Sequence, residues 1–315
     1  MSIPLRIGTR GSALALRQTE QVRNALVRVW PDLKVEIRII KTTGDRIQGR
    51  PLPEIGFKGL FAQELEAALL GREIDAAVHS LKDLPTSIAP GLAIHAICER
   101  VCPLDALVTR DGGTLRDLEP RTVIGTSSLR RKAQILRLRP DLCVVNLRGN
   151  LDTRLRKVND PGPPDGAIMA CAGLQRLGFG DRIAEILGTD IMLPSPGQGA
   201  LAIQGRLDDS ETEQCLSVLD CTATRAAVIA EREVLRRLGG GCHVPIGCLG
   251  QVENSVLHLE AGVFSLDGTR AVCQTMSGDP DQAESVGIAL ADRLLSNGAG
   301  EILDDCSRER RPISD

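Results

Sequence analysis

The feature that most constrains the fold of this chain is a turn that occurs twice. Residues 7–12, Ile-Gly-Thr-Arg-Gly-Ser, and residues 124–128, Ile-Gly-Thr-Ser-Ser, each join an apolar segment to a segment with helical periodicity. Junctions of this kind, from a strand through a short turn into a helix, are typical of α/β folds. Because the junction occurs in both halves, the sequence predicts two α/β domains of similar architecture.

The hydrophobic pattern around each turn extends this prediction. In the first half, apolar, alternating or one-sided segments that indicate strands and helices lie at 5–9, 22–29, 35–39, 59–70 and 76–78. The second half repeats the alternation at 122–125, 129–138, 142–147, from 150 onward, and at 167–170. Strands that alternate with helices in this way predict a parallel sheet in each domain.

Beyond the second half, the chain is expected to cross back and then form a third domain. Residues 191–204 combine prolines and glycines with an apolar run, which predicts a return into the first domain and a hinge beside an interdomain cleft. A helix at 221–238, strands near 256–264 and 271–276, and a helix at 282–295 predict a small α+β domain. We therefore expect domain 1 at 1–98 and 199–217, domain 2 at 99–198, and domain 3 at 218–315.

The composition argues against several classes of protein. No apolar run approaches the ~20 residues that span a bilayer, and the amino end lacks the apolar core of a secretion signal, so a cytoplasmic location is expected. The net charge of -3 gives no general attraction to nucleic acid or to an anionic membrane. The 10 cysteines are scattered and lack paired short spacings, so we expect reduced thiols and no metal site.

Hydroxyl and basic residues gather where the predicted strands end. Ser12 and Ser128 open predicted helices, whose free N–H groups and positive dipole ends suit a carboxylate or phosphate; simple helix capping is the alternative. Arginines follow the second turn and the next junction, at Arg130, Arg131, Arg148 and Arg154. Guanidinium forks match carboxylates, and ligands of open α/β sheets bind at the carboxyl ends of strands. We expect a polyanionic small molecule, with a solvated basic face or a nucleic-acid patch as the alternative.

Two further residues could carry chemistry. Asp83 follows the apolar run and is a candidate acid or base, although it could instead pair with its neighbour Lys82. His79, at the end of the same run, is expected to be packed. Cys242 follows three consecutive glycines, so a ligand could approach its thiol closely; an incidental surface thiol is the alternative.

At these residues the chain resembles the hydroxymethylbilane synthase (porphobilinogen deaminase) family, nearly from end to end. The segments that carry the resemblance are Gly-Phe-Lys-Gly-Leu-Phe at 56–61, Val-His-Ser-Leu-Lys-Asp at 78–83, Gly-Thr-Ser-Ser-Leu-Arg-Arg at 125–131, Asn-Leu-Arg-Gly-Asn at 146–150 and Gly-Gly-Cys at 240–242. Several independent motifs in the same order make the resemblance specific.

The resemblance implies a fold and an activity. The fold would be two periplasmic-binding-protein-like α/β domains around a cleft plus a small α+β domain, with a dipyrromethane cofactor joined by a thioether to Cys242. Four porphobilinogen units would be joined head to tail onto this primer, each losing ammonia. Water would then release the linear tetrapyrrole hydroxymethylbilane, a precursor in tetrapyrrole biosynthesis. Family members imply a monomer whose partners are porphobilinogen and the growing pyrrole chain, without nucleic acid or membrane.

The resemblance also implies residue roles. Asp83 would assist ammonia loss and stabilise the azafulvenium cation, and the catalytic group would further include Lys82, Arg10 and Lys58, the last in a lid loop at 42–58. The cofactor would be held by Cys242, Asp83, Lys82, Ser80, Ser128, Arg130 and Arg131. Substrate and growing chain would be held by Arg10, Ser12, Arg148, Arg154 and Phe61. Gly239, His243 and Phe57 depart from the acidic residue, the Gln and the Gly that are usual in the family. The mobility of the cofactor loop and the closure of the lid, as the resemblance implies them, do not extend in detail to these three positions.

Two other functions fit parts of the pattern. A cytosolic two-lobed module that binds or senses a small polycarboxylate would share the fold, but it would not need the thiol of Cys242. A basic nucleic-acid-binding protein would need aromatic residues for stacking, and aromatic residues are only 2% of the chain.

Overall fold

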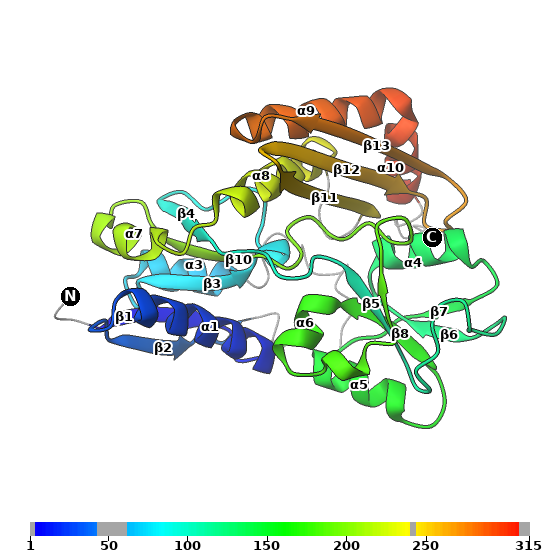
Figure 1. The fold of residues 1–315 in the computed structure, drawn as a ribbon, viewed down its shortest axis with the longest axis horizontal. Coiled ribbons are helices and arrows are strands. Elements are labelled where there is room, and N and C mark those ends of the chain that lie inside the picture. Colours follow the sequence, from blue (N-terminus) through cyan, green and yellow to red (C-terminus); the bar gives the residue numbers. More distant parts are fainter. Residues whose placement is uncertain (1–3, 43–61, 240–243, 309–315) are drawn as a thin grey trace, which may run out of the picture. The chain divides into compact units, whose positions relative to one another are not determined.

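The computed structural model describes residues 4–42, 62–239 and 244–308 (Figure 1). Contacts divide the chain into two compact units, of which unit 1 is Met1–Val101 with Gly199–Arg225 and unit 2 is Cys102–Gln198 with Ala226–Asp315. Within the described residues, unit 1 contains one 5-stranded sheet, and unit 2 contains a second 5-stranded sheet and a 3-stranded sheet. The expected fold class, two α/β regions and a small C-terminal α+β region, is confirmed. The exact three-domain boundaries stay a prediction.

The sheet of unit 1 is mostly parallel and includes one strand from late in the sequence. Its order is β2 (Val35–Ile39), β1 (Leu5–Thr9), β3 (Ala76–Ser80), β10 (Leu201–Arg206) and β4 (Leu92–Ile97). β1 runs parallel to β2 and β3, whereas β10 runs antiparallel to β3 and β4. The predicted return of the chain into the first α/β region is therefore confirmed, because β10 pairs with β3 from Leu201 to Gly205.

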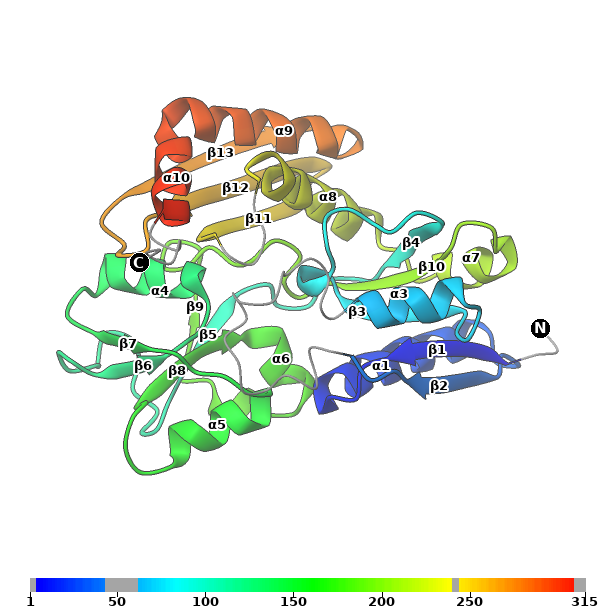
Figure 2. The same cartoon turned by 180° about the vertical axis from the view of Figure 1, so that it is seen from behind.

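Helices bury both faces of this sheet. α1 (Ala13–Val29) and α7 (Ser210–Ser217) pack on one face, where Ile7, Leu26 and Ile203 belong to one fully buried cluster. α3 (Gln63–Leu70) packs on the other face and lies beside β3 in Figure 2, with Leu65 and Ala77 in a separate cluster. A sheet covered on both faces carries continuous apolar strands, as the run at 76–78 indicated.

The first sheet of unit 2 repeats this architecture. Its order is β7 (Cys143–Val145), β6 (Val123–Gly125), β8 (Gly166–Ala170), β5 (Asp105–Thr109) and β9 (Glu185–Leu187). β6 runs parallel to β7 and β8, whereas β5 runs antiparallel to β8 and β9. Its helices are α4 (Leu129–Leu138), α5 (Leu151–Asn159) and α6 (Cys171–Arg176), followed by the short turn η3 (Gly180–Arg182). Strand by strand, the directions match those of unit 1, which confirms the duplicated pattern.

The remaining part of unit 2 is an antiparallel sheet covered by helices. Its strands are β11 (Ile246–Glu253), β12 (Val256–Phe264) and β13 (Ala271–Gly278), and its helices are α8 (Thr222–Arg237), η4 (Pro280–Gln282), α9 (Ala283–Leu294), η5 (Leu295–Ala299) and α10 (Gly300–Arg308). Val234, Leu259 and Leu290 share its core. α8 approaches β11 so closely that a Cβ on Gly250 would lie 2.8 Å from the carbonyl oxygen of Ala227. Among the described helices, none combines the length and the apolar character that a bilayer crossing requires.

Candidate functional site

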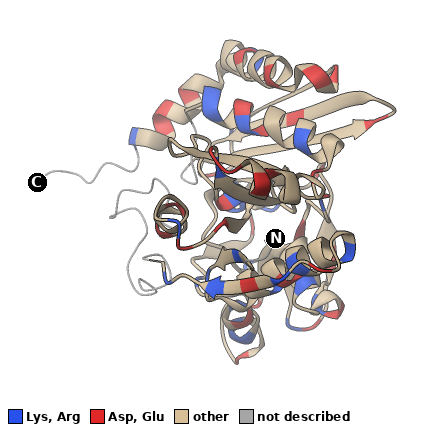
Figure 3. Cartoon of the chain, turned by 90° about the vertical axis from the view of Figure 1, so that its left-hand side faces the viewer, with Lys and Arg blue, Asp and Glu red and all other residues tan. Residues whose placement is uncertain are grey.

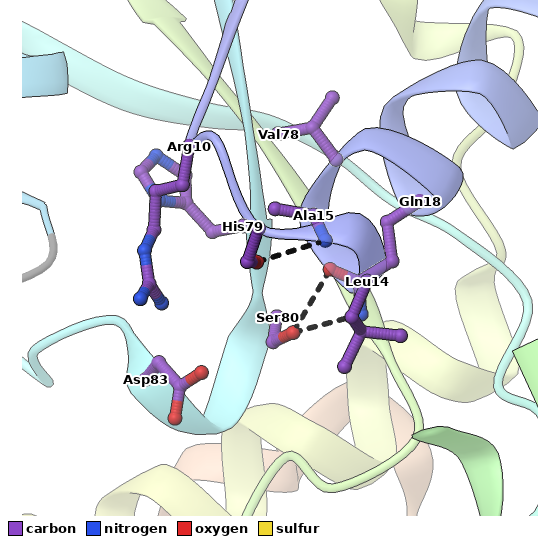
Figure 4. A pocket seen from close by; sticks show the side chains of 9 residues that line it. Arg10, Leu14, Ala15, Gln18, Val78, His79, Ser80 and Asp83 are labelled. Carbon is purple, nitrogen blue, oxygen red and sulfur yellow. Dashed lines mark hydrogen bonds between the residues drawn. The ribbon is translucent and has the colours of Figure 1, made fainter. Parts of the chain in front are cut away.

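A pocket of about 60 Å³ lies in unit 1 at the carboxyl ends of β1 and β3 (Figure 4). It is lined by Arg10, Ser12, Leu14, Ala15, Gln18, Val78, His79, Ser80 and Asp83. Because β1 and β3 are parallel neighbours, the turns that follow them meet at the same edge of the sheet. Four of the predicted site residues, Arg10, Ser12, Ser80 and Asp83, are therefore brought together.

Hydrogen bonds of Ala15 and Gln18, both on α1, shape one wall of the pocket. Ser12 caps the helix, since its Oγ accepts a hydrogen bond of 3.3 Å from the backbone N–H of Ala15. One turn further on, Gln18 Nε2 lies 2.8 Å from Ser80 Oγ, while Gln18 Oε1 lies 3.1 Å from the same oxygen. Gln18 is buried, so it holds the hydroxyl at the end of β3 in place.

Asp83 lies opposite this wall on a short 3₁₀ turn, η2 (Leu81–Asp83). The turn is fixed by Leu81, which is buried and donates its backbone N–H to the Ala200 carbonyl at 3.1 Å. The Asp83 side chain is exposed, and within the described residues its carboxylate has no hydrogen bond or ion pair. Figure 4 shows Arg10 and Asp83 next to each other, on the side of the pocket away from Gln18. The pocket is thus lined by one anionic and one cationic group, and Lys82 is half-buried on the same turn as Asp83.

His79 contributes shape rather than a proton to this pocket. Its side chain is buried, as the sequence predicted. Burial lowers the pKa of His79 to about 4; the side chain of Gln204 opposes this shift, and the nearby charge of Arg10 adds to it. The imidazole is therefore neutral at physiological pH.

The corresponding turn of unit 2, between β6 and α4, has the same cap. Ser128 Oγ accepts a hydrogen bond of 3.4 Å from the backbone N–H of Arg131. The capping alternative is thus realised at both turns. A capping serine uses its oxygen as an acceptor and keeps its O–H as a donor, so capping and ligand binding are compatible.

Arg130 and Arg131 do not lie on a solvated face, because they are buried around Asp105. Arg130 Nη1 lies 2.6 Å from Asp105 Oδ2, and Arg131 Nη2 lies 2.7 Å from Asp105 Oδ1. The exposed fractions are 0% for Asp105, 5% for Arg130 and 6% for Arg131. Burial by itself would raise the pKa of Asp105, but the charges and hydrogen bonds of the two arginines outweigh it and hold that pKa well below its ordinary value.

This cluster of Asp105, Arg130 and Arg131 combines two cations with one anion. Arg131 also donates from Nη1 to the Ile168 carbonyl at 2.9 Å, whereas both hydrogen bonds of Arg130 leave from Nη1, the second reaching the Leu193 carbonyl at 2.6 Å. Nε and Nη2 of Arg130 therefore have no partner among the described residues. An uncompensated positive charge in a buried place favours an additional anion.

Arg148 and Arg154 flank the turn from β7 into α5. Because β7 is the parallel neighbour of β6, this turn lies at the same sheet edge as Ser128. Gly149 has a φ of 117°, a conformation that favours glycine, and its carbonyl accepts a hydrogen bond of 2.8 Å from Arg154 Nε. The predicted residues of the second turn and of this one therefore share one edge of the unit 2 sheet.

Three of the predicted site residues belong to segments that the structure does not describe. Cys242, Lys58 and Phe61 lie outside the described residues, as do the two departures His243 and Phe57. The third departure, Gly239, follows α8 with a φ of 64°, so glycine suits the end of this helix.

Sequence reasoning missed three residues that support the site. Gln18 stands on the apolar stripe that continues with Val22 and Leu26, four residues apart each time. Asp105 stands in the apolar strand β5, and Gln198 donates to its Oδ1 at 2.9 Å. A polar residue within an apolar pattern requires a buried partner, and this was the available signal.

Comparison with known proteins identifies the family of the chain. Residues 5–214 match the family model described as "Porphobilinogen deaminase, dipyromethane cofactor binding domain", and residues 225–296 match the porphobilinogen deaminase C-terminal domain. A porphobilinogen deaminase of Geobacter metallireducens is 49% identical over 95% of this chain and 93% of its own length. A porphobilinogen deaminase of Desulforudis audaxviator is 51% identical over 94% of this chain and 96% of its own length. Among solved structures, a YaeC-family lipoprotein from Enterococcus faecalis covers 69% of this chain and 90% of its own at 11% identity and a TM-score of 0.40, so the fold assignment rests on the sheet orders above. The chain belongs to the porphobilinogen deaminase family.

Proposed function

We propose that this chain catalyses the hydroxymethylbilane synthase reaction, the stepwise joining of four porphobilinogen molecules into a linear tetrapyrrole with loss of ammonia. The observation that carries the proposal is the Asp83 carboxylate, which is exposed, has no partner within the described residues, and lines a pocket at the sheet edge together with Arg10. Full-length similarity to porphobilinogen deaminases supports the same activity.

The residues of unit 2 fit a dipyrromethane cofactor. Such a group carries several carboxylates. The excess positive charge of the Asp105 cluster suits one of them, since two guanidinium nitrogens of Arg130 have no partner within the described chain. The cofactor would be held by Ser128, Arg130 and Arg131 together with Ser80, Lys82 and Asp83, and attached to Cys242. When bound, it supplies the pyrrole terminus to which each new unit is joined.

Asp83 would act on the substrate through its charge. Loss of ammonia leaves a cation on porphobilinogen, and a carboxylate that is not neutralised by a protein cation stabilises this cation directly. The same oxygens can accept the proton that leaves the pyrrole when the new bond forms. An internal ion pair would weaken both effects, so its absence at Asp83 within the described chain supports the assignment.

The basic residues at the sheet edges would hold the acetate and propionate groups of substrate and product chain. We assign this role to Arg10, Ser12, Arg148 and Arg154. The first two stand at the amino end of α1, where free N–H groups and the helix dipole add to the attraction for carboxylates. Lys58, in the expected lid, and Phe61 complete the proposed set.

We further expect a cytoplasmic monomer that acts on a small molecule. On the side of the molecule drawn in Figure 3, acidic and basic residues are interspersed along the helices. Nucleic-acid-binding proteins instead concentrate basic residues on one face.

The purified protein incubated with porphobilinogen tests this function. We expect one ammonia for each porphobilinogen consumed, together with a linear tetrapyrrole detected by its cyclisation to a porphyrin precursor. Binding of porphobilinogen without release of ammonia would favour the alternative, a two-lobed module for a small polycarboxylate.

A further inference from the structure

We propose that Asp105 is a positioning residue, which aims Arg130 and Arg131 at the carboxylates of the cofactor. The proposal rests on the proposed function and extends it to a residue that touches neither substrate nor cofactor. It assigns to one buried carboxylate the orientation of both guanidinium groups.

The geometry gives each oxygen of Asp105 a different arginine. Oδ1 accepts two hydrogen bonds from Arg131, from Nη2 at 2.7 Å and from Nε at 3.1 Å, and Oδ2 accepts one from Arg130 Nη1 at 2.6 Å. Gln198 Nε2 donates to Oδ1 at 2.9 Å as a third constraint. A carboxylate bound on both oxygens cannot rotate without breaking one of these contacts.

The backbone of Asp105 is equally fixed. It begins β5 and pairs with Ala170 of β8 on one side and Leu187 of β9 on the other. The arginines stand in the first turn of α4, directly after the capping Ser128. Asp105, held by an inner strand, thus fixes two side chains at the carboxyl edge of the same sheet.

The other partners of the arginines are neutral. Arg130 donates to the carbonyl of Leu193 and Arg131 donates to the carbonyl of Ile168. Of the groups that bind them within the described residues, Asp105 supplies the negative charge, so the cluster has a net charge of +1. Without Asp105, two buried guanidinium groups would repel each other and lose their orientation.

A substitution of Asp105 distinguishes orientation of the two arginines from simple electrostatic attraction of the cofactor. Asn at position 105 would raise the local charge from +1 to +2, and its amide nitrogen would face the N–H groups of one arginine. If attraction alone governed cofactor binding, Asp105→Asn would load more readily. If orientation governs it, the variant loads less readily, because one guanidinium is displaced.

The test measures cofactor loading by intact mass. Apo-protein of wild type, Asp105→Asn and Asp105→Glu is incubated with increasing porphobilinogen, and the loaded fraction is followed. We expect Asp105→Asn to need at least about tenfold more porphobilinogen than wild type for the same loaded fraction, because the loss of one charged hydrogen bond weakens binding by about this factor. Asp105→Glu, which keeps the charge, should recover part of the loss. For enzyme that is loaded, KM should rise more than kcat falls.

Two controls separate positioning from stability. Asp141→Asn breaks an Asp–Arg pair on the surface, where Arg139 Nη2 lies 2.7 Å from Asp141 Oδ2. Leu142→Ala creates a defect in the buried core of the same unit. Both should load like wild type, even though Leu142→Ala lowers the Tm.

Two results would overturn the proposal. The first is wild-type loading by Asp105→Asn, and the second is a loss of loading by Asp105→Asn and Leu142→Ala in proportion to their Tm. If wild type itself acquires no mass increment, the proposed function fails instead, so the two failures are distinguishable.

Discussion

The Gln18 side chain lies 2.8 Å from the Ser80 hydroxyl, although the two residues are 62 positions apart in the sequence. The contact joins the second turn of α1 to the end of β3, immediately before the turn that carries Asp83. A buried amide thus links the two segments that form the pocket.

Gln18→Leu tests this link. The variant leaves the Ser80 hydroxyl without its partner in a half-buried place, so we expect the free energy of unfolding to fall by about 1 kcal/mol. We also expect KM for porphobilinogen to rise, because Ser80 is no longer held. Urea unfolding and steady-state kinetics check both, and Gln21→Leu, on the exposed side of the same helix, should change neither.

Asp83→Asn should separate catalysis from stability. Asp83 is exposed and unpartnered within the described residues, so its neutralisation should leave the Tm close to that of wild type. If its charge stabilises the cation formed on the substrate, kcat should fall by about 10²- to 10³-fold. Asp32→Asn, at another exposed position of unit 1, is the matched control. A kcat within a few-fold of wild type would remove Asp83 from the mechanism.

The buried His79 should make the protein less stable in acid. Its pKa is about 4 in the folded protein, below the 6.5 of an unperturbed histidine, so the unfolded chain takes up the proton first. The contribution of the neutral His79 to the free energy of unfolding is complete above pH 6.5 and is lost as pH falls toward 4. The total loss is about 3 kcal/mol. Urea unfolding between pH 7 and 4 should show a shallower loss for His79→Asn. His258→Asn, at an exposed histidine, should keep the wild-type slope.

The sequence predicted those helices and strands whose apolar residues recur with the spacing of a helix or of a strand. β1, α4 and β12 begin and end at the residues that the hydrophobic pattern indicated. β11 was missed because Ile246–Gly250 is continuously buried and lacks the alternation of a one-sided strand. The short edge strand β9, three residues long, offers too few positions for any period.

Of the candidate site, the sequence could predict only those residues that follow the end of a recognisable strand. Ser12 and Asp83 follow apolar runs, so their meeting at one edge follows from a parallel sheet. The partners of Arg130 and Arg131 could not be predicted, because Asp105 lies in a strand that pairs with β8 from the opposite direction. A long-range antiparallel pairing leaves no local period, and its only trace was a charged residue in an apolar run.

The covalent attachment at Cys242 is the central claim, and intact mass measures it most directly. After incubation with porphobilinogen, wild type should carry the mass increment of a two-pyrrole unit, and Cys242→Ser should carry none. Cys143→Ser, which removes an exposed thiol elsewhere in the chain, should keep the increment. The account is contradicted if wild type shows only the mass of the polypeptide, or if Cys242→Ser carries the same increment.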